Sequence, residues 1–237
     1  MDLMSRYPDN YFELAIVDPP YGILNKTKRG GDHKFNMEEY KKWDKKPDDK
    51  YFKELFRVSK NQIIWGGNYF GLLWQRSIYN KGFIIWDKNQ PEKLNNFSMA
   101  EMAWSSFDKP SKIFYYSVRK NRNKIHPTQK PIELYEWLLK MYAKEGDKIL
   151  DTHLGSGTIA IACYKAGISL TGCELSELYF KKSQEKIKEI IPSIEIDTSI
   201  KDAYSIKFPN QEKDTHKLYE QMNEQTKQLK VFQKAYL

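Results

Sequence analysis

Asp18, Pro19, Pro20 and Tyr21 form the stretch of this chain whose residue types point most directly to chemistry. They follow the apolar run 14–17, which is typical of a buried strand that ends in a loop. Two consecutive prolines stiffen the backbone and leave carbonyl groups without N–H donors nearby. One carboxylate, free carbonyl oxygens and one aromatic face are the groups needed to hold a flat ring that carries an amino group. A simple turn accounts for the prolines, but not for the acid before them and the aromatic residue after them.

A second motif couples a predicted strand to a predicted helix through Gly155 and Gly157. Glycine lets the backbone approach a ligand closely, and the start of a helix offers free N–H groups. Glu174 ends the next predicted strand, where an acid is placed to hold the two hydroxyls of a ribose. The motif therefore predicts a site for a nucleotide-like cofactor, and a tight turn without a ligand is the alternative.

The spacing of Gly155, Gly157 and Ala160 also fits a dinucleotide site. Two features argue against NAD. Asp151 precedes the glycines, where a carboxylate can take an ammonium group but repels a pyrophosphate, and the motif begins near residue 150 of 237, which leaves little chain for a full dinucleotide sheet. S-adenosylmethionine carries adenosine, a ribose and an amino-acid tail, so it fits both acids.

A third motif, residues 126–131, precedes the helix that leads to the glycine turn. Its two prolines fix the approach of the chain, and we expect its polar side chains to complete the cofactor pocket. His126 is a better candidate for a hydrogen-bond donor than for a metal ligand, because no metal-binding set accompanies it. Cys163 and Cys173 lie in apolar segments and match no metal motif, which favours a reduced, cytoplasmic setting.

These motifs must be positioned by strands and helices, and the apolar periodicity predicts both kinds. We expect strands over 12–17, 62–65, 83–86, 99–105, 112–117, 148–150 and 168–173, with the turn 108–110 between the fourth and fifth. We expect helices over 49–59, 131–142, 155–166 and 175–191, a long loop over 22–48, and a polar terminal helix over 211–237. Strands that alternate with helices predict an α/β fold with a mostly parallel sheet.

The composition is that of a basic protein with a sizeable core. The formal net charge is +8, the pI is about 9.1, and 40% of residues are hydrophobic. Seven basic residues and no acid lie within 109–130, and 22–60 carries twelve basic against seven acidic residues, which raises the prospect of phosphate contacts. No run of 18 apolar residues and no basic-then-apolar leader is present, so we expect neither a membrane partner nor secretion.

Taken together, the three motifs resemble those of the amino-methylating DNA methyltransferases in their circularly permuted beta order, in which the catalytic motif precedes the cofactor motif. The flanking blocks 51–60, 65–70 and 104–110 resemble the small phage- and prophage-type members. The resemblance covers residues 7–192. It implies a Rossmann-like S-adenosylmethionine-dependent methyltransferase fold, a mixed and mostly parallel sheet with helices on both faces.

The resemblance implies a catalytic domain over 1–192, with a catalytic half at 7–117 and a cofactor half at 126–192, followed by a final strand and a polar helix over 193–237. It implies methyl transfer from S-adenosylmethionine to a flipped DNA base, at N6 of adenine rather than N4 of cytosine because the first motif begins with Asp. An N4-cytosine DNA methyltransferase, a non-catalytic DNA-binding module, an RNA or protein methyltransferase and an NAD-dependent oxidoreductase remain as alternatives. A homodimer is compatible with the resemblance.

Site residues follow from the motifs. The catalytic set is Asp18, Pro19, Pro20 and Tyr21. The cofactor set is His126, Thr128, Lys130, Pro131, Asp151, Thr152, His153, Gly155, Ser156, Gly157, Thr158 and Glu174. The DNA-binding set is Lys26, Lys28, Arg29, Arg119, Lys120, Arg122 and Lys124. The chain departs from the family at Thr152 and His153, which replace a proline and an aromatic residue, and only residues 119–125 remain for target recognition. We therefore expect relaxed sequence preference, or DNA reading by the loop over 22–48.

Overall fold

The computed structural model describes residues 1–23, 43–75, 82–90, 98–120, 123–194 and 196, and the backbone of 203–206. Most of the predicted loop over 22–48, the predicted terminal helix, and Lys26, Lys28, Arg29 and Arg122 lie outside these residues. Within them, no helix has the length and apolar character needed to cross a membrane.

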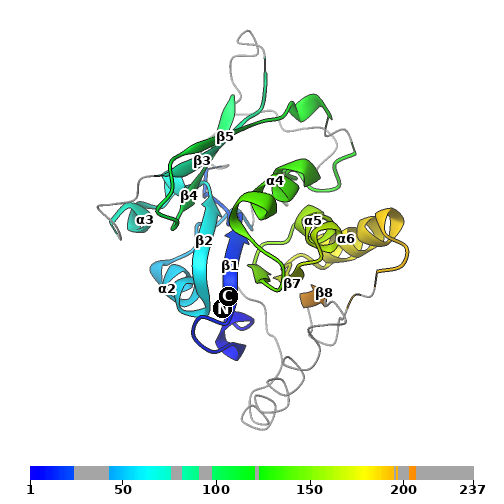
Figure 1. Ribbon diagram of the computed structural model, residues 1–237, viewed down its shortest axis with the longest axis horizontal. Coiled ribbons are helices and arrows are strands. Elements are labelled where there is room, and N and C mark those ends of the chain that lie inside the picture. The colour runs from blue at the N-terminus through cyan, green and yellow to red at the C-terminus, as the bar shows by residue number, and fades with distance from the viewer. Residues whose placement is uncertain are drawn as a thin grey trace.

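One eight-stranded sheet organises the chain, in the order β5-β3-β4-β2-β1-β6-β7-β8 (Figure 1). The strands are β1 (Phe12–Val17), β2 (Ser59–Trp65), β3 (Phe83–Asp87), β4 (Ala100–Ser105), β5 (Lys112–Tyr115), β6 (Lys148–Asp151), β7 (Ser169–Cys173) and β8 (Ala203–Ile206). All seven predicted strands are present, with bounds that differ by a few residues.

The sheet is mixed and mostly parallel. β1 pairs in parallel with both β2 and β6, and β3–β5 and β6–β7 are also parallel. The pairs β2–β4, β3–β4 and β7–β8 are antiparallel. The turn at 108–110 does not form a hairpin between its flanking strands, because β5 pairs with β3 rather than with β4. The predicted fold class is confirmed.

Helices cover both faces of this sheet. They are α2 (Asp49–Val58), α3 (Gly71–Gln75), α4 (Ile132–Tyr142), α5 (Thr158–Ala166) and α6 (Glu177–Ile190), with short 3-10 turns η1 (Met4–Arg6), η3 (Gly67–Tyr69) and η4 (Val118–Lys120). The Asp48 side chain caps α2 by accepting the Tyr51 N–H, and Ser176 caps α6 in the same way through the Tyr179 N–H.

Alternation along β1 divides the core into two clusters. Leu14 and Ile16 pack with α4 and α5 on one face, whereas Ala15 and Val17 pack with η1 and α2 on the other. Side chains of a strand point alternately to opposite faces, so a strand covered on both sides reads as a continuous apolar run. β1 is therefore the buried centre of the sheet, and the residues that follow it are held by a rigid support.

Candidate active site

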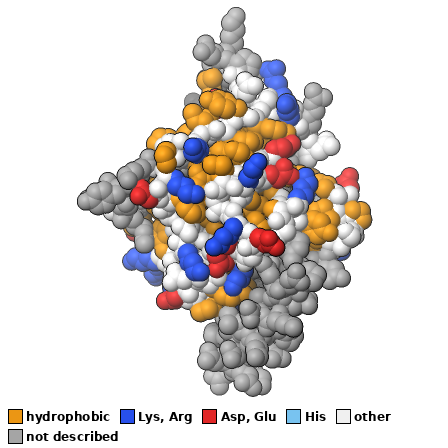
Figure 2. All heavy atoms as spheres, in the orientation of Figure 1, with side chains coloured by type: hydrophobic (Ala, Val, Ile, Leu, Met, Phe, Trp, Pro, Cys, Tyr) orange, Lys and Arg blue, Asp and Glu red, His pale blue; other side chains and the backbone are white. Residues whose placement is uncertain are grey.

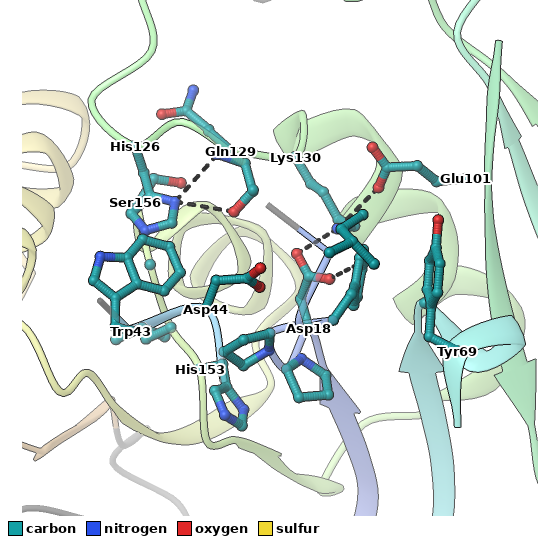
Figure 3. A pocket seen from close by; sticks show the side chains of 18 of the residues that line it. Asp18, Trp43, Asp44, Tyr69, Glu101, His126, Gln129, Lys130, His153 and Ser156 are labelled. Carbon is teal, nitrogen blue, oxygen red and sulfur yellow. Dashed lines mark hydrogen bonds and ion pairs between the residues drawn. The ribbon is translucent and has the colours of Figure 1, made fainter. Parts of the chain in front are cut away.

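A cavity of about 810 Å³ opens at the carboxyl ends of the central strands. β2 lies on one side of β1, and β6 and then β7 lie on its other side. The direction in which successive strands are added to the sheet therefore reverses between β1 and β6. Such a reversal is where open α/β sheets form ligand crevices. The cavity is lined by Asp18 to Tyr21 from the end of β1 and by Thr152 to Ser156 from the turn after β6 (Figure 3). The two sequence motifs thus share one pocket, although more than 130 positions separate them.

Asp18 lies on the cavity wall with its carboxylate held from two sides. The Tyr21 hydroxyl donates to Asp18 Oδ1 at 2.6 Å, and the Lys130 ammonium contacts Oδ2. The Tyr21 ring stacks on Tyr69, with 4.9 Å between centroids and an interplanar angle of 17°. Each carboxylate oxygen accepts more than one hydrogen bond, so Oδ1 keeps acceptor capacity toward the cavity.

Lys130 joins Asp18 to a second carboxylate. Its Nζ lies 3.1 Å from Glu101 Oε2 and 5.0 Å from the centroid of the Trp65 ring, and its side chain is 2% exposed. Glu101 also accepts from Lys88 Nζ at 2.7 Å. Two carboxylates and two ammonium groups therefore form a charge-balanced cluster at the cavity wall, as buried charges require.

The cluster shifts the pKa values of its members. Burial raises the pKa of Asp18, and the Lys130 ammonium offsets only part of this effect. Burial also acts to raise the pKa of Glu101, but Lys130 and Lys88 outweigh it and lower that pKa to about 2. Burial disfavours the charged form of Lys130, yet the two carboxylates raise its pKa. Lys130 is thus held as a cation and Glu101 as an anion.

The turn after β6 supplies backbone groups. Gly155 and Gly157 have φ angles of +54° and +71°, which glycine adopts without the steric cost that other residues meet. α5 begins directly afterwards at Thr158. The Glu174 carboxylate, at the end of β7, accepts the Gly155 N–H at 2.8 Å and the Ser176 N–H at 2.9 Å. Burial raises the pKa of Glu174, while these N–H groups oppose the rise.

Thr152 and His153 line the cavity next to this turn, and Asp151 precedes them at the end of β6. Asp151 is 2% exposed, accepts the His153 N–H at 2.9 Å, and does not line the cavity itself. Burial raises its pKa to about 8. The Thr152 hydroxyl bonds to the Tyr51 hydroxyl at 2.7 Å, and burial lowers the pKa of His153 to about 3. His153 is therefore a neutral ring at the cavity wall.

His126 is neutral as well, because burial, together with the Lys130 charge, lowers its pKa to about 3. Its ring packs edge-on against Tyr179 at 4.4 Å, and its Nδ1 lies 3.1 Å from the Thr128 hydroxyl. The Trp43 ring also lies near the His126 ring, with centroids 5.7 Å apart. No cluster of three or more potential metal ligands occurs among the described residues.

The structure brings most of the predicted site residues together. All four residues of the predicted catalytic set line the cavity, with nine of the predicted cofactor set: His126, Thr128, Lys130, Thr152, His153, Gly155, Ser156, Thr158 and Glu174. Pro131, Asp151 and Gly157 lie behind the wall. Lys130 belongs to the Asp18 side of the pocket, whereas the sequence interpretation grouped it with the cofactor residues.

Several wall residues escaped the sequence analysis. They include Trp43, Asp44, Tyr69, Lys88 and Glu101. Tyr69 follows the two glycines Gly66-Gly67 after β2, and this pattern could have identified it as a site residue. Glu101 and Lys88 are isolated charged residues in or next to strands, and no motif marks them. Their position follows only from the pairing of β3 with β4, which places Trp86 opposite Glu101.

The described members of the predicted DNA-binding set lie outside the cavity wall. Arg119 and Lys120 are exposed on η4, and Lys124 is half-buried in the segment that leads to His126. Lys45 and Lys88 are the basic residues other than Lys130 that line the cavity among the described residues.

Comparison with known proteins finds similarity to DNA methyltransferases in both sequence and fold. Residues 69–185 match the DNA methylase family model N6_N4_Mtase. The type II methyltransferase M.HpaI of Haemophilus parainfluenzae is 26% identical over 227 residues, which cover 78% of this chain and 70% of that protein. A complex of M1.HpyAVI with S-adenosylmethionine superposes with a TM-score of 0.52 at 19% identity, over 75% of this chain and 90% of the other.

The PvuII DNA methyltransferase, which is cytosine-N4-specific, superposes with a TM-score of 0.53 at 12% identity, over 93% of this chain and 88% of the other. At such identities the solved structures establish the fold alone. The family model and the curated relative are both DNA methyltransferases, so the sequence of this chain is similar to that of the N6/N4 amino DNA methyltransferases.

Proposed function

We propose that this protein transfers a methyl group from S-adenosylmethionine to N6 of an adenine that is flipped out of duplex DNA. The observation that carries the proposal is the shared cavity, in which the Asp18 carboxylate and the Gly155 turn face one space. Adenine is favoured over cytosine because the first motif begins with Asp, which by family resemblance leans to adenine.

The residues on the Gly155 side fit S-adenosylmethionine. Its volume suits a cavity of about 810 Å³, within the range of small-molecule sites. Glu174 presents a carboxylate beside the turn, where it accepts the ribose hydroxyls, and the glycines allow close backbone approach. When bound, the cofactor supplies a methyl group on a positively charged sulfur, which makes that methyl an electrophile.

Asp18 and Pro19 prepare the nucleophile. An exocyclic amine is a poor nucleophile because its lone pair is delocalised into the ring. In this proposal one amine N–H donates to Asp18 and the other to the Pro19 carbonyl, which draws the nitrogen toward tetrahedral geometry and aims its lone pair at the methyl group. As the nitrogen–carbon bond forms, the carbon–sulfur bond breaks, and the methylated nitrogen then sheds its proton to solvent. Asp18 need not be a strong base.

The aromatic pair Tyr21 and Tyr69 provides a wall for the base. Tyr69 is 39% exposed, so its outer part is open to a ring that enters the cavity. Taking a base out of the duplex costs a few kcal/mol, and stacking on aromatic side chains returns part of that cost.

The test measures transfer from tritiated S-adenosylmethionine to unmethylated duplex DNA, single-stranded DNA, RNA and protein, followed by nucleoside analysis by mass spectrometry. We expect label in duplex DNA, as N6-methyladenine. N4-methylcytosine would correct the base, and label in RNA or protein would correct the substrate. No label in any of the four substrates would refute methyl transfer as the activity.

Asp18→Ala is the decisive variant. We expect it to abolish transfer while calorimetry shows near-normal cofactor affinity, because Asp18 acts on the base. Asp108→Ala, an exposed aspartate on the 108–110 turn, serves as the matched control and should keep both properties. Full activity in Asp18→Ala would refute the proposed role.

A further inference from the structure

The Lys130 ammonium sits between two carboxylates rather than facing open space (Figure 3). It reaches Asp18 from the segment before α4, 112 positions along the chain, and bridges to Glu101 on β4. Its side chain is almost fully buried, and the Trp65 ring lies beneath the charge. Burying an ammonium group costs free energy unless carboxylates compensate its charge. Asp18 and Glu101 provide that compensation for Lys130.

Burial and the negative charge of Glu101 push Asp18 toward its neutral form, whereas its hydrogen bonds with Tyr21 and Lys130 favour the anion. From β4, Glu101 adds a negative charge, and from β6, Asp151 lies close enough to interact electrostatically. From α4, Tyr135 faces the same region, and Tyr21 donates to Oδ1 without carrying a charge. Lys88 neutralises Glu101 from the end of β3. Lys130 is the cation in direct contact with Asp18 among the described residues.

We propose that Lys130 is a positioning residue for methyl transfer, which keeps Asp18 ionised and fixes its carboxylate so that Oδ1 faces the target amine. The proposal rests on the proposed function. A protonated Asp18 would have fewer acceptor sites, because one of its oxygens would carry a hydrogen. It would also lose its ion pair with Lys130, which fixes the orientation of the carboxylate. In this assignment Lys130 acts on Asp18 and makes no contact with the cofactor, although the sequence motif placed it in the cofactor set.

The experiment compares Lys130→Met, which removes the charge at similar length, with Lys130→Arg, which preserves it. Single-turnover methyl transfer is measured from pH 5.5 to 9.5, and cofactor affinity is measured by calorimetry. In Lys130→Met we expect the acid limb of the rate profile to move up by at least about one pH unit, equivalent to tenfold at low pH. Cofactor affinity should change less than about threefold. If Lys130 made a hydrogen bond to the cofactor, the loss of that charged hydrogen bond would weaken affinity by more than this. Lys130→Arg should lie near the wild type.

Glu101→Gln supplies a second variant with the opposite sign. In this variant Asp18 no longer has the negative charge of Glu101 beside it, and the Lys130 ammonium pairs with Asp18 alone. Ionised Asp18 is then favoured, so the acid limb should move to lower pH. This variant also covers the case in which Lys130→Met fails to fold. An acid limb that stays in place in both variants, or a Lys130→Met protein that loses cofactor affinity with an unchanged pH profile, would overturn the assignment.

A readout independent of turnover separates this proposal from the proposed function. The Asp18 carboxyl is titrated by carbon-13 NMR in protein labelled at aspartate, with Asp18→Asn used to assign the resonance. We expect its midpoint to rise in Lys130→Met and to fall in Glu101→Gln. A wild-type enzyme without transfer to DNA would sink the proposed function while this titration still decides the role of Lys130.

Discussion

Asp151 is a buried carboxyl that reduces the stability of the fold near neutral pH. Its pKa of about 8 lies well above the value near 3.9 of an unfolded aspartate. Between those values the folded state holds a proton that the unfolded state releases, so stability falls as pH rises through this window. A residue kept at such a cost at the end of β6 is consistent with the cofactor role predicted for it.

Asp151→Asn should therefore stabilise the protein at pH 7.5. Asparagine keeps an oxygen that accepts the His153 N–H but carries no ionisable group. We expect a gain of roughly 1–3 kcal/mol in thermal or denaturant unfolding, at about 1.4 kcal/mol per pKa unit with a discount for relaxation. The gain should shrink as the pH is lowered to 5. Asp108→Asn controls for the loss of one negative charge, and an equal gain at both pH values would contradict the explanation.

Glu174 gives a prediction for binding. Its carboxylate orders the Gly155 turn and, in the proposed complex, takes the ribose hydroxyls. Glu174→Ala should weaken cofactor affinity by roughly 1–3 kcal/mol, the scale of hydrogen bonds to a charged group. Calorimetry measures this, with Glu177→Ala as a control from an exposed acid of the first turn of α6. Unchanged affinity would count against the ribose assignment.

At the scale of elements, the end of β2 shapes the position of Tyr21. Gly66 follows β2 with a φ of +67°, and a Cβ placed there would lie 2.0 Å from Cε1 of Tyr21. Real side chains do not approach so closely, so the Tyr21 ring occupies space that only glycine leaves open. The break after β2 thus allows the aromatic wall to form beside Asp18.

Gly66→Ala tests this close packing, and Gly146→Ala is its matched control. Gly146 also has a positive φ, of +85°, but a Cβ at this position would meet nothing within 4 Å among the described residues. Both variants should lose about 1–2 kcal/mol of stability because alanine is strained at positive φ. Only Gly66→Ala should also lose transfer, on the order of 100-fold, because a displaced Tyr21 disturbs the geometry around Asp18. Equal activity in the two variants would show that Tyr21 adapts freely.

Local patterns were enough to predict the strands and helices, since apolar runs and turn residues mark them directly. Which strands pair with each other in the sheet was not predictable from these local patterns. The 108–110 turn joins β4 to β5 along the chain, yet β5 pairs with β3 rather than with β4, because the pairing of strands is decided by packing across the sheet. The short helix α3 has only five residues and left no periodicity to detect.

At the scale of the whole molecule, the site forms where β1 and β6 run side by side. Leu14 pairs with Ile149 and Ala15 with Leu150, and this register brings the turns that follow both strands together. Two of the motifs were visible in the sequence because their residue types are unusual at strand ends, and the third because two prolines flank its polar residues just before a helix. The cluster of Lys88, Glu101 and Lys130 was not visible, because it depends on three segments meeting on one cavity wall.

The basic charge of the molecule belongs to this scale as well. Lysine and arginine side chains are spread among hydrophobic and acidic ones on the face seen in Figure 2, rather than gathered in one block. In the proposed complex with DNA, this face would therefore offer the backbone phosphates separate cations rather than one basic patch. Among the predicted DNA-binding residues that the structure describes, Arg119 and Lys120 on η4 are exposed, whereas Lys124 is half-buried, so the first two are the better candidates.

The double variant Arg119→Ala, Lys120→Ala should weaken binding to duplex DNA without changing cofactor affinity. Each lost phosphate contact lowers the slope of log affinity against log salt by about 0.9, so we expect a decrease near two units. Fluorescence anisotropy at several salt concentrations measures the slope. Lys181→Ala, Lys182→Ala removes the same charge from exposed positions on α6 and should change it much less. Equal slopes in the two double variants would mean that DNA responds to net charge, and that η4 does not touch the phosphates.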